Sequence, residues 1–159
     1  MHFSVAANYD HDLVPELARF PVTEVYGKLP ADPVGGGRPS YMGSPVNWRR
    51  LARYAELLSR QGIAFNYLLN SACLGNREWG RRWQRQFTRL MEKLRHTGIT
   101  RVTVSTPYLL EAVRARFPEF KVRVGIFAQV DTPARARFWE DLGADVITLE
   151  SFSINRDFE

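Results

Sequence analysis

The sequence contains a single cysteine, Cys73, among 159 residues, and only three histidines. One thiol cannot form an internal disulfide, and it cannot by itself supply the ligands of a structural zinc or iron–sulfur site. The histidines fall in different predicted elements and lack the spacing of metal ligands. We therefore expect no metal site built from this chain alone.

Long apolar runs are also missing. No segment reaches the roughly 18 uninterrupted apolar residues that a membrane-spanning helix needs, and residues 1–5 lack the basic flank and apolar core of a signal peptide. The apolar fraction of 45% and the charged fraction of 25% are ordinary for globular proteins. These features predict a cytoplasmic protein without a membrane partner, folded as one domain over residues 1–159.

Acidic residues are in the minority, because 17 Asp and Glu face 22 Lys and Arg, which gives a net charge of +5. A positive balance can favour phosphate-bearing partners through long-range attraction. Nearly all of the positive charge is arginine, which a nucleotide-composition bias in the genome would also produce. The charge alone therefore leaves a polyanion-binding role open.

Short apolar runs and helical segments alternate along the whole chain. Strands are predicted at residues 3–8, 22–29, 63–69, 101–105, 121–128 and 145–149. Helices are predicted at residues 11–20, 48–61, 77–96, 107–117 and 133–142, with Asn47 and Thr132 as caps and Gly62, Gly98 and Gly143 as ends. Regular alternation at about 25 residues per unit requires parallel strands joined by right-handed crossovers.

Two architectures satisfy this pattern. The first is a partial TIM-like (β/α) barrel of about six βα units, and the alternative is a doubly wound parallel sheet. No Gly-x-Gly-x-x-Gly follows the first strand, so the dinucleotide-binding version of the second has no support. A complete barrel needs about 250 residues, so we expect this barrel to be incomplete at its C-terminus.

The predicted helix over residues 77–96 has two contrasting stripes. Its apolar stripe, which is expected to pack on the sheet, consists of Trp79, Trp83, Phe87, Leu90 and Leu94. Its basic stripe consists of Arg77, Arg81, Arg85, Arg89 and Lys93. The basic stripe either contacts RNA phosphates or is a solvated outer face.

Polar residues follow the predicted strands, where the active site of a (β/α) barrel lies. They are Asn8, Lys28, Asn70, Ser105, Gln129 and Glu150. These side chains either line a pocket or simply terminate strands and cap loops. A carboxylate at the end of a buried strand is a good general acid or base, so Glu150 is the candidate catalytic group, unless it only forms a salt bridge with Arg156 or Lys28.

The loop after the second strand contains three consecutive glycines, Gly35, Gly36 and Gly37, followed by Arg38. Consecutive glycines can turn their backbone N–H groups toward an anion, and Arg38 adds a forked cationic donor. A phosphate or a carboxylate would suit such a loop. The alternative is a flexible connection without a ligand.

Several spaced segments resemble the N-terminal half of the collagenase-like peptidase family, peptidase family U32. They are residues 25–29 (VYGKL), 35–40 (GGGRPS), 65–70 (FNYLLN), 139–145 (WEDLGAD) and 148–151 (TLES), together with 154–156 (INR). The resemblance implies a TIM-like barrel and a peptidase activity on collagen-like substrates. It also implies an alternative, because some family members are iron–sulfur proteins that support oxygen-independent hydroxylation of RNA bases or of a quinone precursor.

We therefore carry three functional hypotheses. In the peptidase, Glu150 or a bound water is the base and Lys28 or Arg38 stabilises the oxyanion. In the hydroxylase, a [4Fe-4S] cluster uses cysteines beyond Glu159. In the third, the glycine-rich loop binds a phosphate or other anion without turnover. The substrate-binding candidates are Arg38, Gly36, Gly37, Asn8, Asn70, Ser105, Gln129 and Arg156.

An incomplete barrel would expose the edges of its first and last strands. We therefore expect self-association or a partner subunit to cover these edges.

Overall fold

The computed structural model describes residues 1–36, 46–152 and 154. They form one sheet of six parallel strands in the order β1-β2-β3-β4-β5-β6. The strands are β1 (Phe3–Ala6), β2 (Val22–Gly27), β3 (Ala64–Leu69), β4 (Arg101–Val104), β5 (Lys121–Val124) and β6 (Val146–Ile147). A doubly wound sheet reverses its strand order at a switch point. The sequential order excludes that alternative and confirms the partial barrel.

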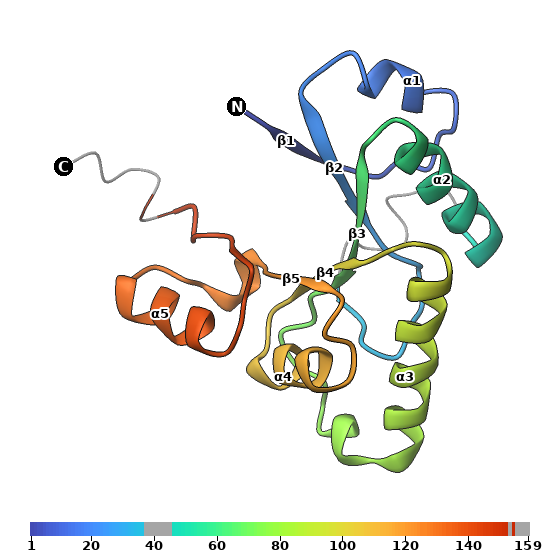
Figure 1. Ribbon diagram of the computed structural model, residues 1–159. Coiled ribbons are helices and arrows are strands. Elements are labelled where there is room, and N and C mark those ends of the chain that lie inside the picture. The colour runs from blue at the N-terminus through green and yellow to red at the C-terminus, as the bar shows by residue number, and fades with distance from the viewer. Residues whose placement is uncertain (37–45, 153, 155–159) are drawn as a thin grey trace.

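Five helices follow the strands. They are α1 (Val14–Leu17), α2 (Trp48–Arg60), α3 (Arg81–His96), α4 (Pro107–Arg116) and α5 (Pro133–Asp141). Figure 1 shows them in an arc around the outside of the curled sheet, which is therefore a half-barrel with β1 and β6 at its two edges. Within the described residues no helix combines the length and apolarity needed to span a bilayer.

The helix starts follow the predicted capping signals. Asn47 accepts the N–H of Arg50 at 2.9 Å at the start of α2, and Thr132 accepts the N–H of Arg135 at the start of α5. These bonds satisfy backbone donors that have no partner inside a helix. Gly98, with φ of 75°, lies two residues beyond the end of α3, in the left-handed region that glycine adopts without strain.

Several predicted elements are shorter than expected, and three of them are much shorter. The helix predicted over residues 11–20 is only α1, because the Asp10 carboxylate accepts the N–H of Asp12 and draws the preceding residues into a turn. The fifth strand ends at Val124, and a 3₁₀ turn over Ile126–Ala128 replaces its predicted last residues. The sixth strand is limited to Val146 and Ile147.

The predicted helix over residues 77–96 is interrupted. A 3₁₀ turn spans Arg77–Trp79, Gly80 is extended, and α3 begins only at Arg81. Trp79 is consequently out of phase with the buried stripe, and 72% of it is exposed. The prediction that Trp79 packs on the sheet was wrong, whereas Trp83, Phe87, Leu90 and Leu94 are buried as predicted.

The outward face of the sheet is apolar and packs against the helices. Residues paired across parallel strands point to the same face, and two such rows cross the sheet. Their members include Tyr67, Val102, Val122, Leu69, Val104 and Val124, all of them fully buried. The covering helices bury Leu51, Leu58, Phe87, Met91, Leu94, Leu109, Leu110 and Val113. Each such apolar side chain typically contributes about 1.5–3 kcal/mol through removal from water.

The inward, concave face is polar. Glu24 of β2 is 3% exposed and accepts a hydrogen bond from the Ser4 hydroxyl of β1 at 2.9 Å. Its carboxylate also pairs with Arg101 of β4 at 3.4 Å and with Arg123 of β5 at 3.0 Å. Strands β2 and β5 are three positions apart, about 14 Å along a flat sheet. The pair between them crosses the hollow of the half-barrel, so this cluster holds the curl of the sheet.

We predict that Glu24→Gln lowers the free energy of unfolding by about 2 kcal/mol, because it leaves two arginines without a compensating charge on the concave face. Urea unfolding measures the loss. Glu56→Gln is the matched control: Glu56 pairs with Arg53 and Arg60 on the exposed face of α2, and its removal should have no measurable effect. Equal effects of the two substitutions would contradict a structural role for the Glu24 cluster.

Candidate functional site

The loop after β2 is anchored by a buried ion pair. The Lys28 ammonium lies 2.9 Å from Asp32 Oδ2, and the two side chains are 7% and 2% exposed. Lys28 also donates a hydrogen bond to the Gly35 carbonyl. The charge of Lys28 is therefore balanced inside the protein, which does not support the expectation that it is available to a substrate oxyanion.

The carboxylate of Asp32 also organises the same loop through hydrogen bonds to both of its oxygens. Its Oδ1 accepts the N–H groups of Val34 and Gly35 at 2.9 and 2.8 Å, and its Oδ2 accepts the Tyr67 hydroxyl at 2.8 Å. Of the predicted anion nest, the Gly35 amide binds an anion within the protein, the carboxylate of Asp32 itself. Gly37 and Arg38, the remaining members of the predicted anion nest, lie outside the described residues.

The loop is pressed against the end of β3. Gly36 has φ of 73°, and a Cβ atom on it would lie only 2.5 Å from the backbone nitrogen of Ser71, so only glycine fits there. On the other side the Trp83 indole N–H of α3 donates to the Pro33 carbonyl at 2.8 Å. The ion pair, the close approach and the indole hydrogen bond together hold the loop between β3 and α3.

Burial changes the titration of the groups in this anchor. Removal from water lowers the pKa of the Lys28 ammonium, although the adjacent Asp32 carboxylate opposes the change. Burial raises the pKa of the Tyr67 hydroxyl far above its ordinary value, and the negative charge of Asp32 raises it further. Tyr67 is thus a neutral hydrogen-bond donor at physiological pH.

Asn70 and Ser105 lie at the ends of β3 and β4, on the concave face. The last paired residues of these strands are Leu69 and Val104, so Asn70 and Ser105 are the next neighbours in the same register. Asn70 Oδ1 and Ser105 Oγ are buried and have no hydrogen-bond partner among the described residues. The centre of the barrel mouth therefore offers one acceptor and one hydroxyl that the described part of the chain leaves unused.

Gly125 follows β5 beside Ser105. A Cβ atom there would lie 2.8 Å from Thr103 Cγ2 and 3.4 Å from Ser105 Oγ. The sequence prediction placed Gln129 at this strand end, but Gln129 follows the 3₁₀ turn, adopts φ of 50° and is exposed. Its carbonyl accepts the Arg135 guanidinium at 2.8 Å. Gly125 thus occupies the position that was assigned to Gln129.

The two outer strands supply the remaining candidates. Asn8 is exposed, and its Oδ1 accepts the N–H of Asp10 at 3.0 Å, which shapes the turn after β1. Glu150 is half-buried beyond β6, where its N–H donates to the Val130 carbonyl and its Oε1 accepts the N–H of Phe152 at 2.6 Å. Asn8 follows the end of β1 and Glu150 follows the end of β6, whereas Arg156 lies outside the described residues.

Asp32 and Tyr67 were missed by the sequence analysis. Asp32 lies in a loop that contains many turn-forming residues, and Tyr67 is in the middle of an apolar strand. One local signal was available, because an Asp followed by Pro33, Val34 and Gly35 is typical of a turn in which the side chain binds the backbone amides that follow it.

The described residues contain no group of three His, Cys, Asp or Glu side chains that could hold a metal ion. Cys73 is exposed, and its sulfur accepts the N–H of Gly75 at 3.3 Å. A [4Fe-4S] cluster takes four thiolates, and this chain has one. The residues of the chain therefore do not fit the cluster that the family resemblance allows.

Comparison with known proteins found one curated relative and several similar structures. No family model matches the chain. The uncharacterized protease MJ1657 of Methanocaldococcus jannaschii is 30% identical over 136 residues, which are 86% of this chain and 39% of that protein. The structure of the U32 peptidase Mk0906 matches 94% of this chain and 58% of its own with a TM-score of 0.70 at 23% identity.

The chain is therefore similar in sequence to a protein named as a protease, and it shares the fold of a U32 peptidase. These similarities support the family resemblance found in the sequence segments, and they confirm the partial TIM-like barrel. This U32-like chain spans about two fifths of the length of the curated relative that it matches. A proposed phosphonomutase from Burkholderia cenocepacia shares the fold with a TM-score of 0.61 at 17% identity, over 96% of this chain and 63% of its own. The fold is thus compatible with different chemistries.

We predict that the stability of the U32-like chain falls above about pH 10, where an unfolded tyrosine loses its proton while buried Tyr67 keeps it. Lys28 has the opposite effect on the pH dependence of stability. Its lowered pKa means that the folded chain releases this proton at a lower pH than the unfolded chain does. Tyr67→Phe isolates the contribution of Tyr67 from those of Tyr9 and Tyr54, whose pKa values are also raised by burial. Its free energy of unfolding should decline less steeply than that of the unmodified chain, by up to about 1.4 kcal/mol per pH unit.

Urea titrations at pH 9, 10 and 11 give the slope of the free energy of unfolding against pH for the unmodified chain and for Tyr67→Phe. Identical slopes would show that Tyr67 ionises as easily in the folded chain as in the unfolded one, contrary to its burial beside Asp32.

Proposed function

We propose that this chain forms the substrate-binding mouth of a peptide hydrolase of the U32 type. The observation that carries the proposal is the pair of uncommitted polar groups at adjacent strand ends, Asn70 Oδ1 and Ser105 Oγ. A peptide group presents one N–H donor and one carbonyl acceptor. An amide oxygen and a hydroxyl side by side are complementary to it.

The binding arrangement follows from this complementarity. Asn70 Oδ1 accepts the N–H of a substrate peptide unit, and the Ser105 hydroxyl donates to a substrate carbonyl. Both groups are buried, so an unfilled site leaves two desolvated polar atoms without partners. A substrate that forms hydrogen bonds with both groups gains more binding free energy than the same hydrogen bonds would give on an exposed surface.

Glu150 is the proposed general base. It removes a proton from a water molecule as the water oxygen attacks the carbonyl carbon, and the carbonyl oxygen becomes an oxyanion stabilised by the Ser105 hydroxyl. The carbon–nitrogen bond then breaks. Protonated Glu150 returns its proton to the leaving amine, and the products are a carboxylate and an amine.

The loop after β2 has a positioning role in this proposal. Its Lys28–Asp32 anchor keeps Gly36 against the backbone of Asn70 and Ser71, which fixes the acceptor that binds the substrate. Asn8, Gln129, Arg38 and Arg156 remain candidates for further substrate contacts around this centre. The exposed positions of Asn8 and Gln129 suit contacts at the rim of the mouth.

We predict that Glu150→Gln reduces kcat for hydrolysis of a quenched fluorescent peptide derived from denatured collagen by at least about 100-fold, because the amide cannot accept the proton from water. Glu140→Gln, an exposed carboxylate on α5, is the matched control and should retain the full rate. Circular dichroism confirms that both variants are folded. Undiminished turnover by Glu150→Gln, or no hydrolysis by the unmodified chain, would refute the proposal.

A further inference from the structure

The positive charge of the chain is concentrated in one helix. The 16 residues of α3 contain six cationic side chains and one acidic side chain. The resulting net charge of +5 equals that of the whole chain, so the other 143 residues are neutral in sum. The excess charge is therefore a local property of the α3 surface rather than a general property of the protein.

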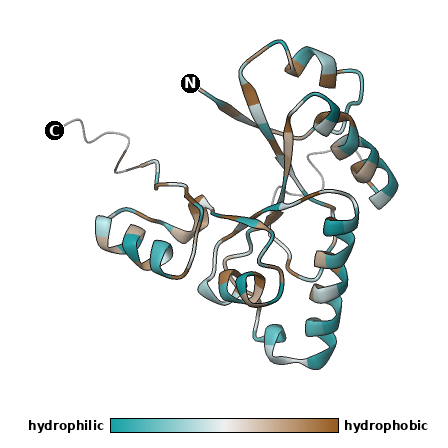
Figure 2. Cartoon of the chain, viewed as in Figure 1, coloured by the Kyte–Doolittle hydropathy of each residue, from teal (hydrophilic) through white to brown (hydrophobic). Residues whose placement is uncertain are grey.

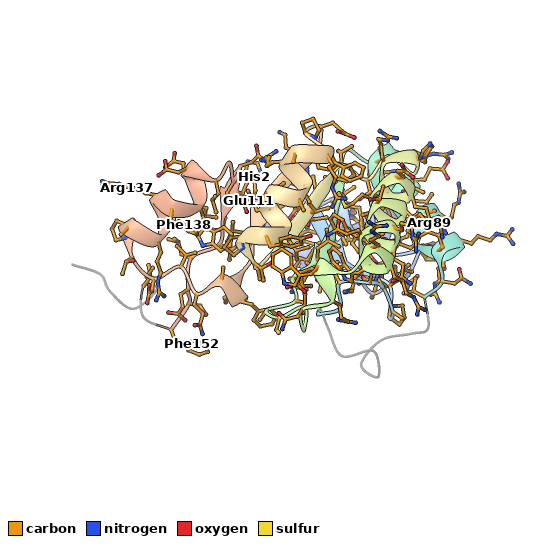
Figure 3. The ribbon with its side chains drawn as sticks, turned by 90° about the horizontal axis from the view of Figure 1, so that it is seen from below. His2, Arg89, Glu111, Arg137, Phe138 and Phe152 are labelled. Carbon is orange, nitrogen blue, oxygen red and sulfur yellow. The ribbon has the colours of Figure 1, made fainter. Side chains whose placement is uncertain are left out.

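The cations of α3 are largely uncompensated. Within the described residues, only Arg95 forms an ion pair, with Glu119 at 3.7 Å. The others are Arg81, Arg82, Arg85, Arg89 and Lys93, and all of them are exposed. Figure 3 shows Arg89 beside α3, at the end of the molecule opposite Arg137. Nor can residues 37–45 neutralise this surface, because they contain no acidic side chain.

A groove lies between α3 and the segments that follow β2. One wall consists of Leu29, Ala31, Asp32, Pro33 and Trp48. The other consists of Arg77, Gln86, Arg89, Leu90 and Lys93. We name this feature the basic groove. Its lining combines apolar side chains with three cations, while the carboxylate of Asp32 is already paired with Lys28.

The basic groove shares two residues with the loop at the proposed active face. Asp32 and Pro33 belong to the loop that lies against the end of β3, and Arg77 begins the 3₁₀ turn after β3. The end of the groove near these residues therefore lies beside the loop that contacts Asn70 and Ser71.

We propose that the basic groove docks an acidic segment of the polypeptide substrate, one that carries apolar side chains among its carboxylates. The substrate assignment rests on the proposed hydrolase function, whereas the docking does not. The cations complement the carboxylates, and Leu29, Pro33 and Leu90 complement the apolar side chains. A segment longer than the groove would extend into the mouth.

The chemistry of the groove favours a peptide over a nucleic acid. Single-stranded nucleic acids gain much of their affinity from bases stacked on aromatic faces. Trp48 is the aromatic residue of the groove, and the Lys93 ammonium already lies over its ring, 5.4 Å from the centroid. The aliphatic part of the lining offers a contact for apolar side chains but no platform for a base.

Fluorescence anisotropy tests the docking with a labelled 12-residue peptide of alternating Glu and Leu, using the intact chain. We expect binding that weakens as salt is raised. Arg89→Glu should weaken it by at least about fivefold at low salt, because the reversal places a negative charge in the groove. Arg137→Glu makes the same charge change on the exposed surface of α5 and should have no effect (Figure 3).

Three results would overturn the proposal: no binding of the peptide, equal effects of the two reversals, or displacement of the peptide by an oligothymidylate at a lower concentration than by unlabelled peptide. Because anisotropy measures binding without turnover, the outcome is independent of the Glu150→Gln assay. Docking without hydrolysis would support the groove and reject the hydrolase, and hydrolysis without docking would do the reverse.

Discussion

The buried pair of Lys28 and Asp32 is the interaction on which the mouth of this half-barrel depends. Two opposite charges removed from water are costly unless their remaining hydrogen-bonding positions are filled. Here Asp32 accepts two backbone amides and the Tyr67 hydroxyl, and Lys28 donates to the Gly35 carbonyl. The pair therefore orders the glycine-rich loop by binding its backbone directly, in addition to the packing of Val34 in the core.

The position of that loop determines two surfaces. Against β3 it lies over Asn70, whose amide oxygen has no partner in the described part of the chain, and against α3 it forms one wall of the basic groove. Figure 2 shows polar and apolar residues alternating along the helices, as expected for segments with one buried face. The sheet divides in the same way, with an apolar outer face for the helices and a polar concave face crossed by the Glu24 pairs.

Much of this fold follows from the sequence, because apolar periodicity and capping residues are local signals. They predicted the order of strands and helices, the caps at Asn47 and Thr132, and the strand ends at Asn70 and Ser105. The partner of Lys28 was not predicted. Glu150 and Lys28 were both expected at the mouth, but Lys28 pairs with Asp32. This choice of partner depends on how the loop after β2 folds back, which local sequence patterns do not determine. The exposure of Trp79 was missed for a related reason. The extended residue Gly80 separates Trp79 from α3, so Trp79 does not continue the buried stripe of that helix.

Hydrogen exchange of the Asp32→Ala variant tests the central role of the anchor most directly. The substitution removes the charge partner of Lys28 together with the oxygen that accepts the amides of Val34 and Gly35. We predict that the amides of Val34 and Gly35 lose their protection, together with those at the end of β3, while the amides of α4 and β5 keep theirs. Unchanged protection at Val34 and Gly35 would contradict the account, because the loop would then be held by something other than the ion pair.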